Sequence, residues 1–413
     1  MITQKISRII LLFTSLCFVL SGCWDKKEIE ENAYVIAIGL DPSDAGGIKV
    51  TYNIANPQVG SAKGVNVDEP PASIVSFTAP DLTAARDTAT AFVTRKVNYN
   101  HTNVLIVSEE LARKEDFFNY ISTAVKDREL QRDLTVIVTK EKAKEFFDKN
   151  KPELETRPHK YYQFMINRTK ETGFVPVSDL HRYMQKTELD SDLFLSLYAT
   201  ATPENQKYGN EDEYLAGEIK KESGNPTQVI GSAVFKHGKM IGLLTGEETR
   251  MALLLTPKAK DLGTMLTSYQ DPLDEKYRIS TRVSKPEGTE ISMDFSKDPV
   301  EIKVNIPLNI EIVGIPSLID YAIDMDKQML LEKSIKQQIE KKAMELIKKT
   351  QEEFKGQPFY WSLPGRKYFS TVEEWKNYDF DEKYKDMEVE VTIDITLAGF
   401  GEQIITPKYP KKE

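Results

Sequence analysis

The chain has 413 residues, of which 55 are basic and 64 acidic, so its net charge at pH 7 is −9. An acidic surface is repelled by nucleic acid and by anionic headgroups, which excludes a broad interface with either of them. Its two cysteines, Cys17 and Cys23, lie near the start, so disulfides and cysteine metal sites are not expected in the rest of the chain. A chain of this length predicts two or three domains.

The first 22 residues have the pattern of an export signal. Two basic residues precede the apolar run Ile9–Leu20, which is shorter than the roughly 20 residues of a membrane-spanning helix. The run ends in a lipobox, which predicts cleavage between Gly22 and Cys23 and transfer of diacylglycerol to the Cys23 thiolate. The mature chain would carry 53 basic and 64 acidic residues, a net charge of −11. An ordinary secretory signal with an incidental cysteine, or an uncleaved anchor, is the alternative.

Residues 23–32 would form a short lipidated leader that reaches only about 30 Å when fully extended, so the first domain is expected close to the membrane. Residues 33–190 predict an α/β domain. It opens with a hairpin of Ala33–Leu40 and Ile48–Ile54, after which strands alternate with helices. Strands are expected at Ser73–Thr78, Val104–Val107 and Leu134–Val138. Helices are expected after Asp81 and around Phe117–Val125 and Ala143–Phe147. Two further helical pieces are expected over Pro158–Gln185, with Ser178 as the N-cap of the second.

Residues 191–257 predict a β-rich middle domain, which can pack with the 33–55 hairpin. Leu193–Tyr198 has the composition of a strand, and Gln228–Leu244 that of a hairpin. Its two-residue turn is His237-Gly238, because both residue types tolerate the positive φ that such a turn requires.

Residues 258–413 predict an α+β domain. Apolar residues alternate from Val300 to Ile312 and from Met387 to Leu397, and an amphipathic helix runs from Leu331 to Phe354 between them. Together with an expected hairpin at 277–296, this gives an antiparallel sheet with a long helix on one face. Pro307 is expected in an edge strand or at a break. The whole chain is therefore expected to mix α/β and α+β structure in three domains.

Motifs of catalysis are not found in the sequence. The four histidines are far apart without a second ligand at metal spacing, and neither a nucleophile elbow nor a phosphate-binding loop is present. Acidic pairs such as Glu109-Glu110 are expected on solvated helix faces. We therefore expect no enzyme activity, no metal and no cofactor, although carboxylates from distant segments could still converge.

Aromatic residues are concentrated between residues 356 and 386. One interpretation is a protein interface, with Trp361, Tyr368 and Trp375 as the candidate contacts, because tryptophan and tyrosine carry much of the binding energy of interfaces. A satellite core packed over the long helix is the more common fate of such residues. A carbohydrate platform is the third interpretation.

The residues also carry a family resemblance. Gly22-Cys23-Trp24-Asp25 and then Ala33–Asp41 resemble the opening of the Ger(x)C family, the C-subunit lipoproteins of spore nutrient-germinant receptors. The hairpin from Gly231 to Gly242 resembles the family's central motif, and Trp375 with the alternating run that follows resembles its C-terminal end. The likeness spans nearly the whole chain and departs from the family pattern at Phe359–Leu363.

The resemblance implies a non-enzymatic lipoprotein subunit on the extracytoplasmic face of the spore inner membrane, held there by the lipid on Cys23. Its implied partners are two integral-membrane proteins, an A subunit and a permease-like B subunit, with which it would trigger germination. No small-molecule substrate is implied for this subunit. Trp24 and Asp25 match the family motif and join the interface candidates.

Two other functions remain open. A solute-binding lipoprotein of a membrane transporter would need two similar α/β lobes around a cleft. A surface hydrolase would need a catalytic constellation.

Overall fold

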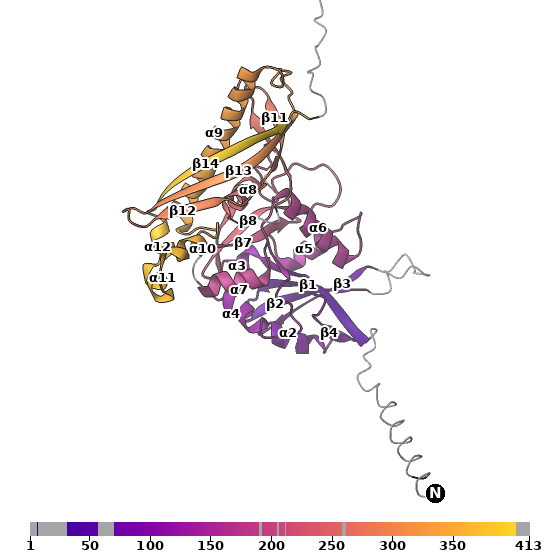
Figure 1. The fold of residues 1–413 in the computed structure, drawn as a ribbon. Helices are drawn as coiled ribbons and strands as arrows, with labels where there is room; N and C mark the ends of the chain where they lie inside the picture. The colour runs from indigo at the N-terminus through magenta and orange to yellow at the C-terminus, as the bar shows by residue number, and fades with distance from the viewer. Residues whose placement is uncertain are drawn as a thin grey trace, which may run out of the picture.

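The computed structural model describes Ile6 and residues 31–56, 70–189, 192–204, 206–210, 212–257 and 262–401 (Figure 1). The predicted lipid site Cys23 and its neighbours Gly22, Trp24 and Asp25 lie outside the described residues. Within these ranges, no helix combines the length and the apolar character that crossing a bilayer requires. The described chain forms two sheets with helices packed on them.

The first sheet has nine strands in the order β3-β2-β1-β5-β6-β7-β8-β9, with β4 paired to the start of β1. The four central strands, β1, β5, β6 and β7, run parallel, while antiparallel pairs extend the sheet on both sides. Its strands are β1 (Asn32–Pro42), β2 (Ile48–Ala55), β3 (Ala72–Ala79), β4 (Lys96–Asn98), β5 (Val104–Ser108), β6 (Thr135–Thr139), β7 (Phe194–Thr200), β8 (Gln228–Lys236) and β9 (Lys239–Leu244).

Helices cover both faces of this sheet, as parallel strands require. One face packs against α2 (Leu82–Ala89), α3 (Glu109–Ala112), α4 (Phe117–Ala124) and α7 (Leu180–Leu189). The other packs against α5 (Ala143–Lys149) and α6 (Pro158–Thr172). Figure 1 shows these two groups on opposite sides of β1 and β2. The predicted α/β region is therefore confirmed.

The caps of two helices differ in how well the sequence predicted them. The Asp81 carboxylate accepts from the Ala84 amide at 2.8 Å and begins α2, as predicted. The cap of α7 was predicted at Ser178 and is instead Asp179, whose carboxylate accepts from the Arg182 amide at 2.7 Å. Ser178 is buried, and its hydroxyl donates to the carbonyl of Val136. The Ser178 side chain is directed at the strand, and Asp179 accepts from the helix amide in its place.

The middle region at 191–257 is not a separate domain in the structure, because its strands β7, β8 and β9 continue the first sheet. Every residue of β7 is buried, which identifies a strand covered on both faces. His237 and Gly238 form the β8–β9 turn with φ of +50° and +79°, as the hairpin requires. The region also holds a helix that was not predicted, α8 (Gly246–Leu255).

The second sheet has five strands in the order β10-β11-β13-β12, with β14 on the other edge of β13. The long helix covers one face through an apolar stripe of Leu331, Ile335, Ile339 and Ala343. This confirms the predicted sheet under a long helix. The elements are β10 (Met265–Gln270), β11 (Arg278–Ser284), β12 (Glu290–Asp294), β13 (Glu301–Gly314), α9 (Met325–Lys349), the π-helical turn η3 (Thr350–Phe354), α10 (Ser362–Gly365), η4 (Arg366–Tyr368), α11 (Val372–Tyr378), α12 (Phe380–Tyr384) and β14 (Glu388–Gly399).

Strand pairing in this sheet corrects two predictions. The expected hairpin at 277–296 does not form, because β11 and β12 both pair with β13, one after the other along the same edge. Pro307 is neither in an edge strand nor at a break, since β13 runs through it with β14 parallel alongside. It lies in the gap between Asn305, the last partner of β12, and Asn309, the first partner of β11. No neighbour on that edge needs the N–H that proline lacks.

The two sheets share a core. Leu193, Leu195 and Val234 from the β7–β8 end of the first sheet belong to the same apolar cluster as α8, α9 and the second sheet. In Figure 1, β7 and β8 accordingly lie beside α8, between the N-terminal strands and the second sheet.

Candidate functional site

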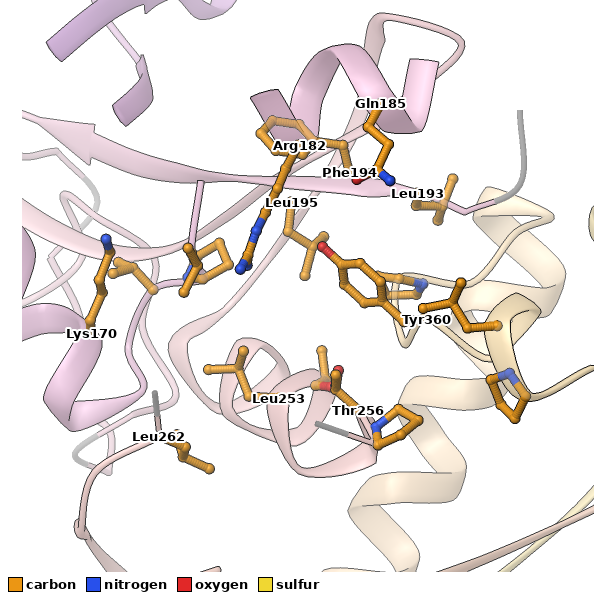
Figure 2. Close-up of a pocket in the computed structure, with 18 of the residues that line it drawn as sticks. Lys170, Arg182, Gln185, Leu193, Phe194, Leu195, Leu253, Thr256, Leu262 and Tyr360 are labelled. Carbon is orange, nitrogen blue, oxygen red and sulfur yellow. The ribbon is translucent and has the colours of Figure 1, made fainter. Parts of the chain in front are cut away.

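A pocket of about 470 Å³ opens where the two sheets meet. Figure 2 shows its walls, which come from α6 and α7, from β7, from the end of α8 and from the aromatic segment. The apolar wall residues include Val175, Val177, Phe194, Leu195, Ala252, Leu253, Leu262, Pro358 and Leu363. Segments spread from residue 170 to residue 367 therefore build one site, which no local motif could have revealed.

Among the residues that the structure describes in this pocket, every charged side chain is basic. These side chains are Lys170, Arg182 and Lys367. Figure 2 shows Arg182 projecting from α7 into the space, with the Tyr360 ring across from it. The Arg182 guanidinium also pairs with Asp179 at 3.2 Å. Burial raises the pKa of the Tyr360 hydroxyl, and the nearby Arg182 charge opposes that shift without cancelling it.

Tyr360 is held in a strained conformation. Its φ of +62° lies in the left-handed region, which a bulky L-residue rarely adopts. The side-chain carbonyl of Gln357 accepts from the amides of Phe359 and Trp361, at 2.9 and 3.2 Å, and so fixes the backbone on both sides. The Tyr360 ring lies over the Lys186 ammonium at 3.5 Å. These contacts fix the orientation of the Tyr360 ring at the pocket wall.

A buried ion pair lies beside the pocket. Lys186 of α7 pairs with Asp192 just before β7, and both side chains are almost inaccessible to solvent. Gln357 donates to the same carboxylate, as does the Ser362 hydroxyl at 2.8 Å. Burial lowers the pKa of Lys186, although Asp192 opposes the shift. The pair therefore ties the first sheet to the aromatic segment of the second.

A second buried ion pair joins the sheets on the other side of α8. The Arg250 guanidinium binds Asp212 at 2.8 Å and donates to the carbonyl of Thr172 at 2.9 Å and of Leu266 at 3.0 Å. It also lies 4.2 Å from the Phe174 ring centroid. Because α6, α8 and β10 all contribute to this arrangement, the two sheets form one body.

The aromatic segment at 356–386 divides into a buried part and a surface part. Trp361 has no exposed surface, packs 4.8 Å from the Phe359 ring and donates its indole N–H to the carbonyl of Leu255 at 3.0 Å. A fully buried side chain offers a partner nothing to contact, so Trp361 is corrected from an interface candidate to a core residue.

The surface part keeps the other two interface candidates. Tyr368 is 53% exposed, and Trp375 is half-buried in a cluster with Phe295, Phe369 and Tyr378. We call Tyr368 with these four residues the surface aromatic cluster. The described residues contain no group of three or more His, Cys, Asp and Glu side chains arranged to hold a metal ion.

The sequence interpretation missed Lys186, Asp192 and Arg182. One signal was available, because Lys186 follows Tyr183 by one helical turn and so lies on the stripe of α7 that faces the core. A lysine in such a stripe needs a buried partner. The identity of that partner could not be read from the sequence, since the partner comes from outside the helix.

Comparison with known protein families gives two matches to consecutive parts of the chain. Residues 25–199 match the spore germination protein N-terminal domain, and residues 230–401 match the C-terminal domain described as spore germination B3/GerAC-like. Together they span most of the sequence.

Curated relatives come from Bacillus subtilis (strain 168). Spore germination protein KC is 32% identical over 123 residues, which are 29% of this chain and 30% of that protein. Spore germination protein B3 is 20% identical over 408 residues, which are 96% of this chain and 98% of that protein. The chain therefore aligns with less than a third of one relative and with nearly all of the other.

A solved structure has the same fold. The crystal structure of the GerBC protein superposes with a TM-score of 0.53 over 87% of this chain and 96% of its own, at 14% sequence identity.

Proposed function

We infer the function from one premise: the chain belongs to the family of spore germination proteins that form the C subunits of germinant receptors. We propose that it is a lipoprotein on the extracytoplasmic face of the spore inner membrane, anchored through Cys23. There it would act through contacts with integral-membrane A and B subunits to trigger germination. The observation that carries the proposal is the pair of family domains directly after a lipobox.

The start of the described chain supports the anchoring. Strand β1 begins at Asn32, nine residues after Cys23, a distance of about 30 Å at full extension. In Figure 1, β1 begins at the end of the molecule away from the second sheet. The second sheet would therefore project away from the bilayer, and the first sheet would lie next to it.

The surface aromatic cluster supports the contact with partners. Tyr368 of η4 is exposed and Trp375 of α11 is half-buried in the same cluster, and tyrosine and tryptophan are typical of interface hot spots. We therefore propose that the A or the B subunit contacts the chain at Tyr368 and Trp375.

The anchoring is tested by replacing Cys23 with Ala and growing cells with an alkyne analogue of palmitate. Cys17→Ala is the matched control, because Cys17 lies in the apolar run that leaves with the signal. We expect label on the natural and the Cys17→Ala proteins and none on Cys23→Ala, and a response to nutrient reduced at least tenfold in Cys23→Ala spores only. Full membrane association and normal germination of Cys23→Ala would contradict the proposal.

The interface is tested by Tyr368→Ala, with Tyr208→Ala as the control at a fully exposed tyrosine elsewhere on the chain. Co-purification of the A and B subunits with the tagged chain should fall at least fivefold for Tyr368→Ala and remain unchanged for Tyr208→Ala. Equal recovery with both variants would exclude this surface.

The structure offers little support for a solute-binding lipoprotein of a transporter. That function needs two similar lobes. Here the first sheet has nine strands with four parallel strands at its centre, whereas the second has five strands and is mostly antiparallel.

A further inference from the structure

We propose that the pocket between the two sheets binds a small amphipathic anion, an organic carboxylate with an apolar aliphatic or aromatic body. This goes beyond the proposed function, because that function rests on the lipid anchor and on protein partners. It also departs from the sequence-based expectation that this subunit takes no small molecule.

The size and the walls of the pocket fit such a ligand. A volume of about 470 Å³ lies within the range of roughly 300–1,000 Å³ typical of small-molecule sites, and sites of this kind occur preferentially where domains meet. Its walls are mainly apolar, from Val175 and Val177 on one side to Leu253 and Leu363 on the other. An apolar body would replace water along these walls.

The charge of the pocket selects the sign of the ligand. Lys170, Arg182 and Lys367 line it, and none of its described lining residues is acidic, although the protein as a whole is acidic. Arg182 is half-buried, pairs with Asp179 at 3.2 Å through its Nε, and extends into the space shown in Figure 2. A guanidinium presents parallel N–H donors that match a carboxylate, and such bonds are stronger where water is excluded.

One wall of the pocket is fixed by the fold. Tyr360, in its left-handed conformation, is held by the Gln357 hydrogen bonds and by its position over Lys186, so its ring has a set orientation at the wall. Strain of this kind occurs preferentially at ligand sites. Since the walls belong to both sheets, a bound ligand would also stabilise their relative position.

The test uses the full chain in nanodiscs of neutral lipid, titrated by calorimetry with 4-phenylbutyrate and with its neutral counterpart 4-phenylbutanamide. Empty nanodiscs give the background. We expect the carboxylate to bind at least tenfold more tightly than the amide.

Three variants locate the site. Leu363→Trp, at a rim position that is 62% exposed, should block binding of both compounds by filling the mouth. Lys367→Gln, at an exposed lysine, should weaken only the carboxylate, at least threefold, as should Arg182→Gln. Lys341→Gln on the solvent face of α9 is the matched control and should change neither affinity.

Each contrary outcome overturns the proposal. Equal affinities for the carboxylate and the amide would exclude selection by charge. Binding that persists unchanged in Leu363→Trp would place the ligand elsewhere, and no binding of either compound at millimolar concentration would exclude the site. Because none of these measurements involves germination or the A and B subunits, a failure of binding would leave the proposed receptor function untouched.

Discussion

Trp361 and Trp375 are only 14 positions apart in the sequence, yet they have different roles. The indole N–H of Trp361 satisfies a backbone carbonyl at the end of α8, whereas Trp375 packs on the half-exposed Phe369 and Tyr378. Leaving a buried carbonyl without its donor lowers the free energy of unfolding more than losing a surface contact does.

Trp361→Phe should therefore lower the free energy of unfolding by about 2–3 kcal/mol, from the lost hydrogen bond and the space left by the smaller ring. Trp375→Phe, the matched change at the half-buried site, should cost less than about 1 kcal/mol. Urea unfolding followed by far-UV circular dichroism measures both. Similar losses for the two variants would contradict the assigned roles.

Lys285 gives a pH-dependent prediction. Its ammonium donates to the carbonyls of Leu254 and Thr256 at 3.0 and 2.7 Å, and burial lowers its pKa from 10.5 to about 8. Between these two values the unfolded chain holds a proton that the folded chain lacks. The free energy of unfolding must therefore rise with pH through this window, and the contribution is lost as the pH falls through 8.

The difference in unfolding free energy between the natural protein and Lys285→Met should accordingly change by about 3 kcal/mol between pH 7.5 and 10.5, in favour of the natural protein at high pH. Denaturant titrations at four pH values give this difference directly. A difference that stays constant would show that Lys285 keeps its ordinary pKa.

Among the elements, α8 lies where the two sheets meet. It packs against α9 and β8 and contributes Leu254 and Leu255 to the core that the sheets share. Its start is a capping box, in which the Thr245 hydroxyl accepts from the Glu248 amide and the Glu248 carboxylate accepts from the Thr245 amide. Helix α11 begins with the same motif at Thr371, but none of its residues is fully buried.

Thr245→Ala should lower the global stability by about 1 kcal/mol, the usual cost of a lost cap. Thr371→Ala removes an equivalent cap from an exposed helix, so it should increase local hydrogen exchange in α11 with less than about 0.5 kcal/mol of global loss. Thermal unfolding measures the global loss of each variant, and hydrogen exchange by mass spectrometry measures the local opening of α11. Equal global losses would contradict the difference in burial.

At the scale of the whole molecule, the buried pair Lys186–Asp192 is linked to the aromatic segment through the bonds that Gln357 and Ser362 donate to Asp192. Removing one charge of a buried pair leaves the other without compensation, which typically costs about 3–5 kcal/mol. Asp192 retains Gln357 and Ser362 as donors when Lys186 is lost, whereas loss of the Asp192 carboxylate removes the charge that most strongly stabilises the Lys186 ammonium.

Asp192→Asn should therefore destabilise the protein more than Lys186→Met does, and the double variant should lie within about 1 kcal/mol of Lys186→Met alone. A double-mutant cycle in urea measures this coupling. Strict additivity of the two losses would show that the pair does not act as a unit.

Several features of this protein follow from local patterns in its sequence. The lipobox, the alternation along β13 and β14, the apolar stripe of α9 and the positive-φ turn at His237 depend on residues a few positions apart. The periodicity of apolar residues indicates which face of an element is buried, and residue types that tolerate positive φ indicate where the chain reverses.

The pairing of elements, in contrast, depends on long-range packing. The alternation in β11 and β12 is compatible with a hairpin, yet both strands pair with β13. The pairing could not be predicted, because the burial pattern of a strand does not identify its neighbour. The merger of β7–β9 with the first sheet, the burial of Trp361 and the basic pocket around Arg182 likewise depend on segments that are far apart in the chain. Hydrogen-bond ladders and shared cores are set by long-range packing, which a single sequence does not encode in any local pattern.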